Sequence, residues 1–577
     1  MDGNNPAPAG EFDFIVMGSG GGALTAAITA ADLGLRVLVV EKADVVGGTT
    51  ALSGGAIWVP CNPVAAAAGI VDTPEQAREY LGHVMSNHFR PDLVDAYLKH
   101  GPAMVAMVQE RTEHRFAVET FVTDYKPELP GAVDFGRSLG SVPYDARRLG
   151  EHAAKVRRPL PSAMLLGGMS IDFGDVKYLM SVTKSWTSFR KVAGLILDYA
   201  RDKLTHGRDM RMTLGNALIG GLFKAALDKG VSFRTGTPVV GLHRNDNRVA
   251  GVIVEVGGQR ETILASRGVL LASGGFANNE ELKSRHFKPG LEHPTMSVAE
   301  CTGDAMRIGL EAGGRTGAQL HQNFLGFPLS VYTRADGSSE TIMHSEGQRS
   351  MPGSICINEA GERFLNEALP YNDFAYAFER SGCERAYFVI DERALRNYGF
   401  GPVRPGPRWL RPLDEFLNAG YLISAPTIAE LAFKLEVDPA RMRATVERYN
   451  RFAAGGTDPD FSKGVSQHDR NNGDPTHQSH PNIGPLDQAP YYAIRIHPGN
   501  LGTYVGMEVD AHARVLGEDG LPVQGLHACG LDAHSIFAGC YPGGGSSIGP
   551  SMVFGYIAAL SAAGRLTDAP GTDARAA

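Results

Sequence analysis

A short glycine-rich turn near the N-terminus has the residue types and spacing of a phosphate-binding site. Gly18-Ser-Gly-Gly-Gly-Ala23 stands between an apolar run, 12–17, and a run of helix-forming residues, 24–33. A second apolar run, 36–40, ends in Glu41, which lies 23 residues after the first glycine. In such a βαβ unit the glycines allow a tight turn and a close approach of pyrophosphate, while the helix N-terminus offers free N–H groups. The acidic residue accepts hydrogen bonds from ribose hydroxyls. The pattern predicts a dinucleotide site.

Two small, hydroxyl-rich segments follow directly. They are Gly47-Gly-Thr-Thr50 and Ala51-Leu-Ser-Gly-Gly-Ala-Ile-Trp58. Such segments supply backbone N–H groups and hydroxyls with little bulk, which suits a cofactor that stays buried rather than a nicotinamide that comes and goes. Thr49, Thr50 and Ser53 lie where a diphosphate and an isoalloxazine ring would pass. The pattern therefore favours FAD.

Further glycine-rich segments at strand ends appear hundreds of residues later. An apolar run at 265–271 ends in Ala272-Ser-Gly-Gly275, and Leu526-His-Ala-Cys529 is followed by Gly530. The loop 539–550 then leads into a helical run, 551–562. Because ligands bind at the carboxyl ends of parallel strands, these segments indicate a second edge of the same nucleotide site.

Length and composition exclude several classes of protein. A chain of 577 residues is too long for one core. The net charge of −8 argues against a nucleic-acid partner. The six cysteines show no metal-ligand spacing, so we expect reduced thiols, no metal site and a cytoplasmic location. Residues 1–10 have neither a basic nor an apolar region of a signal peptide and are expected to form a disordered tail. No apolar stretch is long enough to span a membrane.

The elements that must position these residues indicate an α/β fold. We expect a Rossmann-like FAD-binding domain, split in sequence as in the GR2 type, with an inserted α+β catalytic or substrate domain. The expected boundaries are 11–283 for the first FAD-binding part, 284–482 for the insertion and 483–577 for the second FAD-binding part. Within 176–212, an amphipathic helix with basic flanks allows peripheral contact with a membrane surface, although packing onto the domain is the favoured interpretation.

Several runs resemble a known family. They include Gly361-Glu-Arg-Phe-Leu-Asn-Glu-Ala-Leu-Pro-Tyr371 and Tyr541-Pro-Gly-Gly-Gly545, together with the segments 18–25, 47–58 and 549–556. The split layout is similar to that of fumarate reductase and succinate dehydrogenase flavoproteins. Within that group the chain most resembles the 3-ketosteroid Δ1-dehydrogenases, over residues 12–562.

The resemblance implies a desaturation next to a ring ketone, with FAD accepting the hydride. It implies that Tyr371 is the base that removes the α-proton and that Tyr125 supports it by hydrogen bonding. It also implies that the Tyr541 hydroxyl and the Gly545 N–H bind the 3-keto oxygen. A free tyrosine has a pKa near 10, so a tyrosine base needs a hydrogen-bond donor to stabilise its phenolate.

The resemblance further implies a steroid-like apolar ketone as substrate and an external electron acceptor, such as a quinone or an electron-transfer protein. In the fumarate and succinate group a histidine near the Gly-Gly-Thr run links the flavin covalently; none stands between Gly47 and Trp58, so FAD is expected to be non-covalent. The candidate cofactor-binding residues are Gly18, Ser19, Gly20, Gly22, Ala23, Glu41, Lys42, Gly48, Thr49, Thr50, Ser53, Gly54, Val239, Ala272, Ser273, Gly274, Gly530, Asp532, Ser547 and Ile548.

The chain departs from the family pattern at two places. Lys126 follows Tyr125 where a second tyrosine is frequent, and Leu531-Asp532 follows Gly530 where asparagine is expected. Alternatives therefore stay open: a 3-ketosteroid Δ4-dehydrogenase, a desaturase of another cyclic ketone, or a fumarate-reductase-like enoate reductase. The last would need cationic groups in the loop 539–547, which has no charge. A flavin-binding protein without enzymatic activity would leave the tyrosines unexplained.

Overall fold

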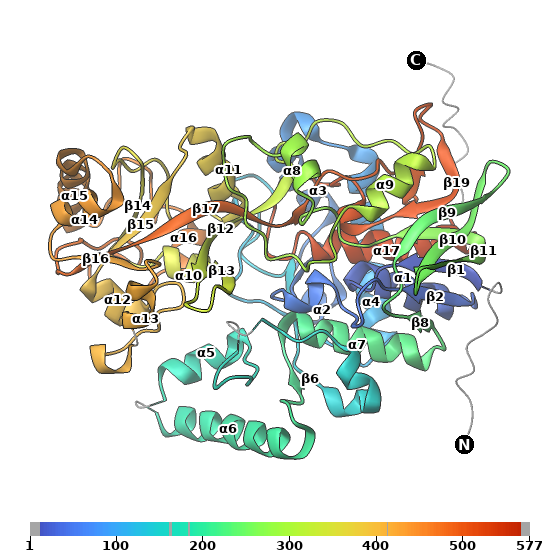
Figure 1. The fold of residues 1–577 in the computed structure, drawn as a ribbon, viewed down its shortest axis with the longest axis horizontal. Helices are drawn as coiled ribbons and strands as arrows, with labels where there is room; N and C mark the ends of the chain where they lie inside the picture. The colour runs from blue at the N-terminus through green and yellow to red at the C-terminus, as the bar shows by residue number, and fades with distance from the viewer. Residues whose placement is uncertain (1–11, 161–163, 183–184, 412, 567–577) are drawn as a thin grey trace.

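The computed structural model describes residues 12–160, 164–182, 185–411 and 413–566. The expected tail, 1–10, lies outside the described residues. The fold contains two large sheets at opposite ends of an elongated body (Figure 1).

The first sheet has eight strands, in the order β18-β19-β11-β1-β2-β8, with β9 and β10 extending it through β11. The five neighbouring strands β19, β11, β1, β2 and β8 are parallel. The strands are β1 (Phe12–Met17), β2 (Val37–Val40), β8 (Ser232–Arg234), β9 (Val239–Asn245), β10 (Arg248–Val256), β11 (Gln259–Leu271), β18 (Arg514–Leu516) and β19 (Pro522–Ala528). Because β19 comes from the far C-terminal part, the sheet is assembled from two separated segments, as predicted for a split Rossmann-like domain.

Helix α1 (Gly21–Asp32) follows β1 and packs between α7 (Leu214–Asp228) and α17 (Ile548–Ala562). Small residues allow this close packing. A Cβ added to Gly22 would lie 2.4 Å from Oγ of Ser551, and one added to Gly555 would lie 2.3 Å from the carbonyl oxygen of Gly22. The N-terminal and C-terminal segments of the nucleotide-binding domain are thus in backbone contact.

The second sheet is antiparallel and has six strands, in the order β13-β12-β17-β15-β14 with β16 beside β17. Helices α11, α14 and α15 pack beside its strands. The elements of this part are β12 (Phe324–Thr333), β13 (Ser339–Met343), α10 (Glu346–Arg349), β14 (Ser354–Asn358), α11 (Tyr371–Ser381), β15 (Ala386–Asp391), α12 (Glu392–Tyr398), α13 (Leu413–Asn418), β16 (Ile423–Ala425), α14 (Ile428–Leu435), α15 (Pro439–Ala454), α16 (Gln467–Asn471) and β17 (Tyr491–Thr503).

Strand β17 corrects one expected boundary. The segment from 483 onward was expected to belong to the nucleotide-binding part, yet β17 pairs with β12, β15 and β16 of the second sheet. Its first residues, Tyr491-Tyr-Ala-Ile, form an apolar run that suits a buried strand in either sheet, so the pattern alone could not assign it.

The start of the insertion at 284 also needs correction. Helix α9 (Asp304–Glu311) buries Ala305, Met306 and Ile308 in the core of the first sheet. The guanidinium of Arg307 donates to the carbonyl oxygen of Val240 in β9 at 3.1 Å. We propose that the second domain comprises roughly the segment from β12 to β17, a little narrower at its start and wider at its end than expected.

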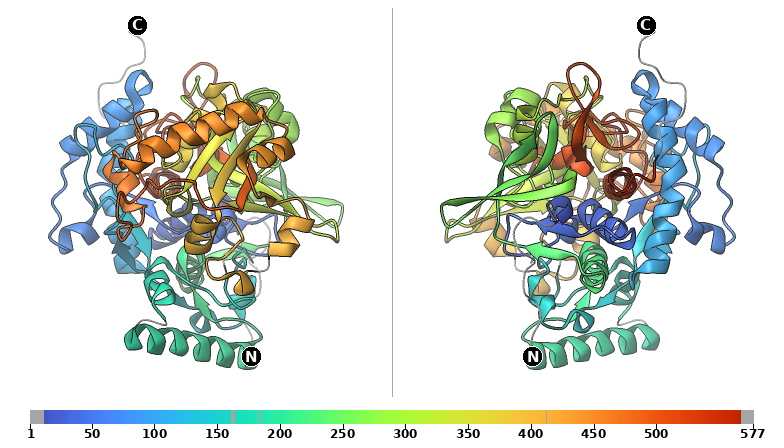
Figure 2. Two further views of the ribbon diagram at one scale, coloured as in Figure 1. Left: turned by 90° about the vertical axis from the view of Figure 1, so that its left-hand side faces the viewer. Right: turned by 90° about the vertical axis from the view of Figure 1, so that its right-hand side faces the viewer.

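The remaining α-helices and β-strands lie outside the two large sheets. They are β3 (Ile57–Trp58), α2 (Pro63–Ala67), α3 (Pro74–Met85), α4 (Pro91–Arg111), β4 (Phe116–Val118), β5 (Ser138–Ser141), β6 (Tyr144–Asp145), α5 (Phe173–Met180), α6 (Trp186–His206), β7 (Arg211–Met212) and α8 (Glu280–His286). The helices expected within 74–112 and from Trp186 are confirmed. Helices α5 and α6 form a hairpin at the lower edge of the molecule (Figure 1; Figure 2). In the described part of the chain, no helix combines the length and apolar character that crossing a bilayer requires.

Candidate active site

The predicted nucleotide-binding segments meet at the N-terminus of α1. Gly18 has φ +104°, and a Cβ there would lie 2.3 Å from the carbonyl oxygen of Ala272. A Cβ on Gly48 would lie 3.9 Å from Cα of Gly20. Thr50 Oγ1 accepts the N–H of Gly21 at 3.2 Å. The turn after β1 therefore lies against both the hydroxyl-rich segment and the end of β11.

Glu41 is held at the end of β2. Its carboxylate accepts the hydroxyl of Ser19 at 2.6 Å and the N–H of Ala43 at 2.9 Å. Burial raises its pKa, and these hydrogen bonds oppose the rise. Val239 begins the strand that follows Thr237, whose N–H donates to the Glu41 carbonyl at 2.9 Å.

Lys42 points elsewhere. Its ammonium group forms an ion pair with Asp304 at 2.9 Å and donates to the hydroxyl of Thr302 at 2.8 Å. The Thr-Gly-Asp run at 302–304 is thus tied to the end of β2. This pairing explains why the cation next to Glu41 is oriented toward α9.

The other wrapping residues are also held in place. Thr49 Oγ1 accepts the N–H of Val298 at 3.2 Å, and Ser53 Oγ donates to the carbonyl of Thr50 at 2.7 Å. Gly54 lies beside Phe173 of α5. The hydroxyl-rich segment is therefore ordered by its own hydrogen bonds, while its small residues leave its surface free of bulk.

Asp532 connects the two separated cofactor segments. Its buried carboxylate accepts the N–H groups of Ser273 and Gly275, the latter at 2.9 Å. The pKa of Asp532 is raised by burial, against the effect of those N–H donors. The carboxylate thus caps the turn that contains Gly274.

The site suits a bound dinucleotide on three structural counts. Among the described residues, the N-cap residues Gly20 of α1 and Ser547 of α17 form no side-chain capping hydrogen bond, and at α1 Thr50 accepts only the first N–H, that of Gly21. Ile548 lies over α1, 3.5 Å from a Cβ placed on Gly21. A cavity bounded in part by Gly530, Ser547 and Tyr504 lies next to the start of α17. Uncapped N–H groups at two helix starts are what an anionic cofactor requires.

Three tyrosines converge from distant parts of the chain. The ring centroids lie 5.7 Å apart for Tyr125 and Tyr371, 5.1 Å for Tyr371 and Tyr541, and 5.8 Å for Tyr125 and Tyr541. The three hydroxyls influence one another's pKa, and the backbone of Gly545 lowers that of Tyr541. The four residues that the resemblance singled out are therefore adjacent. We refer to the three side chains as the tyrosine cluster.

The electrostatics of the tyrosine cluster disfavour a phenolate in the absence of ligands. Burial raises the pKa of Tyr371 well above its usual value, and Tyr125, Tyr541 and Glu346 add to the rise. The pKa of Tyr125 is also raised well above its usual value by burial. For Tyr541, burial raises the pKa, while hydrogen bonds from Tyr371, Ser547 and Gly545 oppose the rise.

The loop that carries Tyr541 and Gly545 is packed onto β3. Gly545 has φ +102°, and a Cβ there would lie 2.6 Å from the backbone carbon of Ile57. A Cβ on Gly543 would lie 2.5 Å from the ring of Trp58. The indole N–H of Trp58 donates to Asp124 at 2.8 Å, next to Tyr125. Trp58 thereby links the Tyr541 loop to the segment of Tyr125.

Asp124 is a buried member of this arrangement. It forms an ion pair with Arg137 at 2.7 Å, and both side chains are 1% exposed. Burial raises the pKa of Asp124 to about 6, and the charge of Arg137 opposes the rise. The Tyr125 N–H donates to the carbonyl of Pro542 at 2.9 Å. These contacts therefore hold the backbone segments of Tyr125 and Tyr541 against each other.

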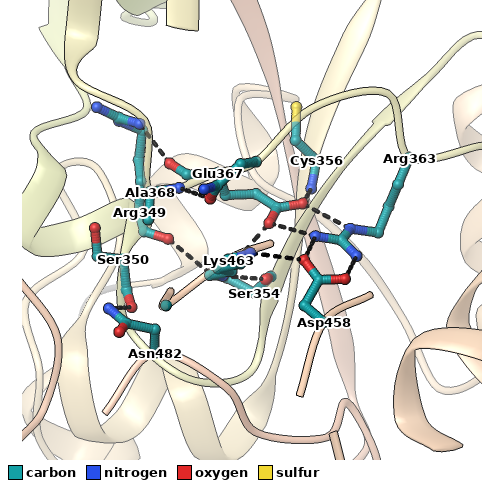
Figure 3. Close-up of polar contacts among 12 residues, drawn as sticks. Arg349, Ser350, Ser354, Cys356, Arg363, Glu367, Ala368, Asp458, Lys463 and Asn482 are labelled. Carbon is teal, nitrogen blue, oxygen red and sulfur yellow. Dashed lines mark hydrogen bonds and ion pairs between the residues drawn. The ribbon is translucent and has the colours of Figure 1, made fainter. Parts of the chain in front are cut away.

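A buried ionic cluster holds the segment that leads into Tyr371 (Figure 3). Arg363 pairs with Glu367 at 2.8 Å and with Asp458 at 2.9 Å, and Lys463 lies 3.6 Å from Glu367. Arg349, whose side chain is fully buried, donates to the carbonyl oxygens of Glu367 and Leu369. We call Arg349, Arg363, Glu367, Asp458 and Lys463 the anchoring cluster. It sets the path of the backbone immediately before Tyr371.

Sequence reasoning missed several neighbours of the tyrosine cluster. The ring of Phe327 stacks on Tyr371 with centroids 4.5 Å apart, and that of His468 lies 4.9 Å from Tyr125. The buried Tyr504 hydroxyl and His468 Nε2 have no hydrogen-bond partner among the described residues. Glu346 accepts the N–H of Tyr371 at 2.9 Å. No local motif surrounds these residues, although Tyr504 directly follows the Leu-Gly-Thr run at 501–503.

Lys126, the first departure from the family pattern, also lies beside the cluster. Its ammonium group pairs with Asp373 of α11 at 2.7 Å. The cation next to Tyr125 is therefore matched by an anion two residues after Tyr371.

The comparisons with known proteins agree with this geometry. A family described as "FAD binding domain" matches residues 13–548. The chain is 36% identical over 553 residues to a 4-oxocyclohex-2-ene-1-carboxylate 5-dehydrogenase of Sinomonas cyclohexanicum, covering 95% of this chain and 92% of that protein. It is 34% identical over 571 residues to a 3-oxosteroid 1-dehydrogenase of Mycobacterium tuberculosis, covering 95% and 98% of the two chains.

A solved structure gives the same result. The 3-ketosteroid Δ1-dehydrogenase of Sterolibacterium denitrificans, in complex with 1,4-androstadiene-3,17-dione, superposes with a TM-score of 0.89 at 33% identity and covers 96% of this chain and 100% of that chain. The fold and the site define an FAD-dependent oxidoreductase. Within that class, the chain belongs to the 3-oxosteroid 1-dehydrogenase family.

Proposed function

We propose that the protein desaturates the C1–C2 bond of a 3-ketosteroid. The observation that carries this proposal is the convergence of Tyr125, Tyr371 and Tyr541 beside a glycine-rich loop without charge. An uncharged loop suits a neutral ketone on an apolar skeleton, whereas a dicarboxylate substrate needs cationic partners.

FAD, held without a covalent link, supplies the hydride acceptor when it is bound. Its pyrophosphate is assigned to the N–H groups at the start of α1, and its ribose to Glu41. The hydroxyls of Thr49, Thr50 and Ser53 and the start of α17 are assigned to its remaining polar groups. These assignments rest on the adjacency of the segments around Gly18.

The residues of the tyrosine cluster have different roles in the proposed reaction. The Tyr541 hydroxyl and the Gly545 N–H bind the 3-keto oxygen and polarise the carbonyl, which acidifies the proton on C2. Tyr371 accepts that proton, and Tyr125 supports its phenolate by hydrogen bonding. The ligand-free site raises the pKa of Tyr371, and Tyr541 contributes to the rise. Binding of the ketone oxygen by Tyr541 removes part of this contribution and so favours the phenolate of Tyr371.

A ring ketone that carries a carboxylate is the second candidate. Two relatives at 36% and 34% identity are named as dehydrogenases of oxocyclohexene and oxocyclohexane carboxylates. Lys126, the cation next to Tyr125 in the sequence, is already paired with Asp373 at 2.7 Å. This pairing favours the neutral substrate of the first proposal.

Anaerobic mixing of the holoenzyme with 4-androstene-3,17-dione or with 4-oxocyclohexanecarboxylate distinguishes the two. Bleaching of the flavin by the steroid, together with a 1,4-diene product, supports the proposal. Bleaching by the carboxylate alone favours the second candidate. Reduction by a 5α-3-ketosteroid with formation of a 4-ene would instead identify Δ4 regiochemistry. If none of these ketones bleaches the flavin, both candidates are wrong.

Oxidation of the reduced enzyme by a quinone or by an electron-transfer protein tests the external acceptor.

A further inference from the structure

One face of α6 is apolar and exposed along the whole helix. Trp186 is 75% exposed, Leu197 70% and Leu204 88%, and Phe189 and Ile196 are exposed as well. Their spacing of three, seven, one and seven residues places these side chains on one stripe of an α-helix. We call these five residues the α6 stripe. The ring of Trp186 stacks on Phe189 with centroids 5.4 Å apart, so the aromatic end of the stripe is continuous.

The opposite face of α6 attaches the helix to the protein. Val192 and Tyr199 are 7% and 8% exposed, and the Tyr199 hydroxyl donates to the carbonyl of Leu166 at 3.2 Å. Asp202 is buried and pairs with Arg147. The face of α6 that carries Val192, Tyr199 and Asp202 therefore packs against the rest of the protein. Both views of Figure 2 place α6 at the outer edge of the molecule. The exposure of its five side chains shows that the α6 stripe faces solvent.

Cations surround the α6 stripe. The helix carries Arg190, Lys191, Arg201 and Lys203, all exposed, against Asp198 and the buried Asp202. The protein as a whole has a net charge of −8, so this local excess of positive charge is not a general property of its surface. Apolar residues with an aromatic end and flanking basic side chains are the features of a helix that lies in a bilayer interface and contacts anionic headgroups.

The hairpin of α5 and α6 also adjoins the candidate active site. Phe173 of α5 is 52% exposed, and its ring lies 6.4 Å from that of Phe121, which is 51% exposed. A Cβ on Gly54, in the predicted cofactor wrap, would lie 3.7 Å from Cε2 of Phe173. Phe121 stands four residues before Tyr125. The same hairpin thus carries the α6 stripe and an apolar pair next to the site.

We propose that α6 lies in the interfacial plane of an anionic lipid bilayer, with the α6 stripe in the acyl boundary and the basic residues at the headgroups. The apolar pair Phe121–Phe173 then lies on the membrane side of the active site, where a ketone dissolved in the bilayer enters. The entry route rests on the proposed function, whereas the binding of lipid by α6 does not.

Sedimentation of the full-length holoenzyme with vesicles tests the proposal. Vesicles of phosphatidylcholine with phosphatidylglycerol are expected to bind the protein more tightly than vesicles of phosphatidylcholine alone, and added salt should weaken the binding. The double variant Leu197→Ser/Leu204→Ser should lose binding by more than about tenfold. Phe433→Ser is the matched control, because Phe433 is 80% exposed on α14, far from α6 in the sequence and in Figure 1.

The outcomes separate lipid binding from catalysis. Both variants should retain flavin and the rate of flavin reduction by a water-soluble ketone, because the substituted residues contact neither the tyrosine cluster nor the cofactor segments. Failure of the wild-type protein to sediment with either vesicle, or equal binding by the double variant, overturns the proposal. A dimer in light scattering that the double variant abolishes would show that a second copy covers the α6 stripe, and would also overturn it. Absence of any ketone turnover with lipid binding intact would refute the proposed function alone.

Discussion

The carboxylate of Asp532 accepts the N–H of Gly275 at 2.9 Å, across 257 positions of sequence. This contact closes the split nucleotide-binding domain at the point where the ends of β11 and β19 meet, and it fixes the turn that contains Ser273 and Gly274. The contact depends on an acid in the segment Leu531-Asp532, where the chain departs from the expected family pattern.

Asp532→Asn should weaken the contact between the two segments of the nucleotide-binding domain. Asparagine offers a single acceptor oxygen to the two N–H groups that the carboxylate now accepts, so one buried donor loses its partner. We expect a loss of about 1–3 kcal/mol in the free energy of unfolding. Thermal unfolding of the holoenzyme and the flavin retained after gel filtration measure it. Asp519→Asn, an exposed acid in the neighbouring β18–β19 turn, is the control. Equal stability of the two variants would contradict the role of Asp532.

Tyr371→Phe should abolish proton removal while FAD stays bound. The substitution removes the hydroxyl that contacts both Tyr125 and Tyr541 and leaves the stacking on Phe327. Flavin reduction by the ketone is expected to slow by about 10²–10⁴-fold. Tyr376→Phe, one turn later on α11, is the matched control and should keep the wild-type rate. A variant of Tyr371 that retains most of its activity would exclude this residue as the base.

The rate of flavin reduction should rise with pH through the neutral and alkaline range. Burial and the neighbouring hydroxyls hold the pKa of Tyr371 well above its usual value, so only a small fraction is phenolate at neutral pH. Below the pKa this fraction increases about tenfold per pH unit. The pH profile of kcat/KM, which reports the free enzyme, should therefore climb without a plateau below about pH 9. A plateau already at neutral pH would mean that the base has a lower pKa.

Glu367→Gln should destabilise the second domain and disturb Tyr371. Glu367 is fully buried between Arg363 and Lys463, and removing its charge leaves two cations poorly compensated. We expect a loss of about 3–5 kcal/mol in the free energy of unfolding. Because the anchoring cluster sets the backbone before Tyr371, kcat should fall more than KM changes. Glu362→Gln, an exposed neighbour, controls for the substitution. An unchanged melting temperature in Glu367→Gln would contradict this role.

We also expect Glu367 to make the free energy of unfolding depend on pH in the acid range. Burial alone would raise the pKa of Glu367, but Arg363 and Lys463 outweigh it and lower the pKa below the usual 4.5. A depressed carboxyl pKa contributes stability above pH 4.5, and this contribution is lost as the pH falls through the folded value. Wild-type stability should therefore drop more steeply below pH 4.5 than that of Glu367→Gln. Parallel curves of unfolding free energy against pH would refute this.

The sequence by itself determined the nucleotide-binding turn and much of the secondary structure. The glycines from 18 to 22, Glu41 and the segment 47–58 lie within one βαβ unit and its continuation, where spacing along the chain translates directly into position. The tyrosines could not be identified from spacing along the chain. Each stands in an unremarkable context, and only the resemblance to a known family singled out Tyr125, Tyr371 and Tyr541.

Only the tertiary structure decided which distant residues meet. It brought together Tyr125 and Tyr541 across 416 positions, placed Phe327 and His468 beside them, and turned Lys42 toward Asp304. It also assigned β17 to the second sheet, and it showed that α6 packs on the protein by one face while the α6 stripe stays exposed. The physical reason is that periodicity specifies which face of an element is apolar, whereas the partner of that face depends on how the whole chain closes around its cores.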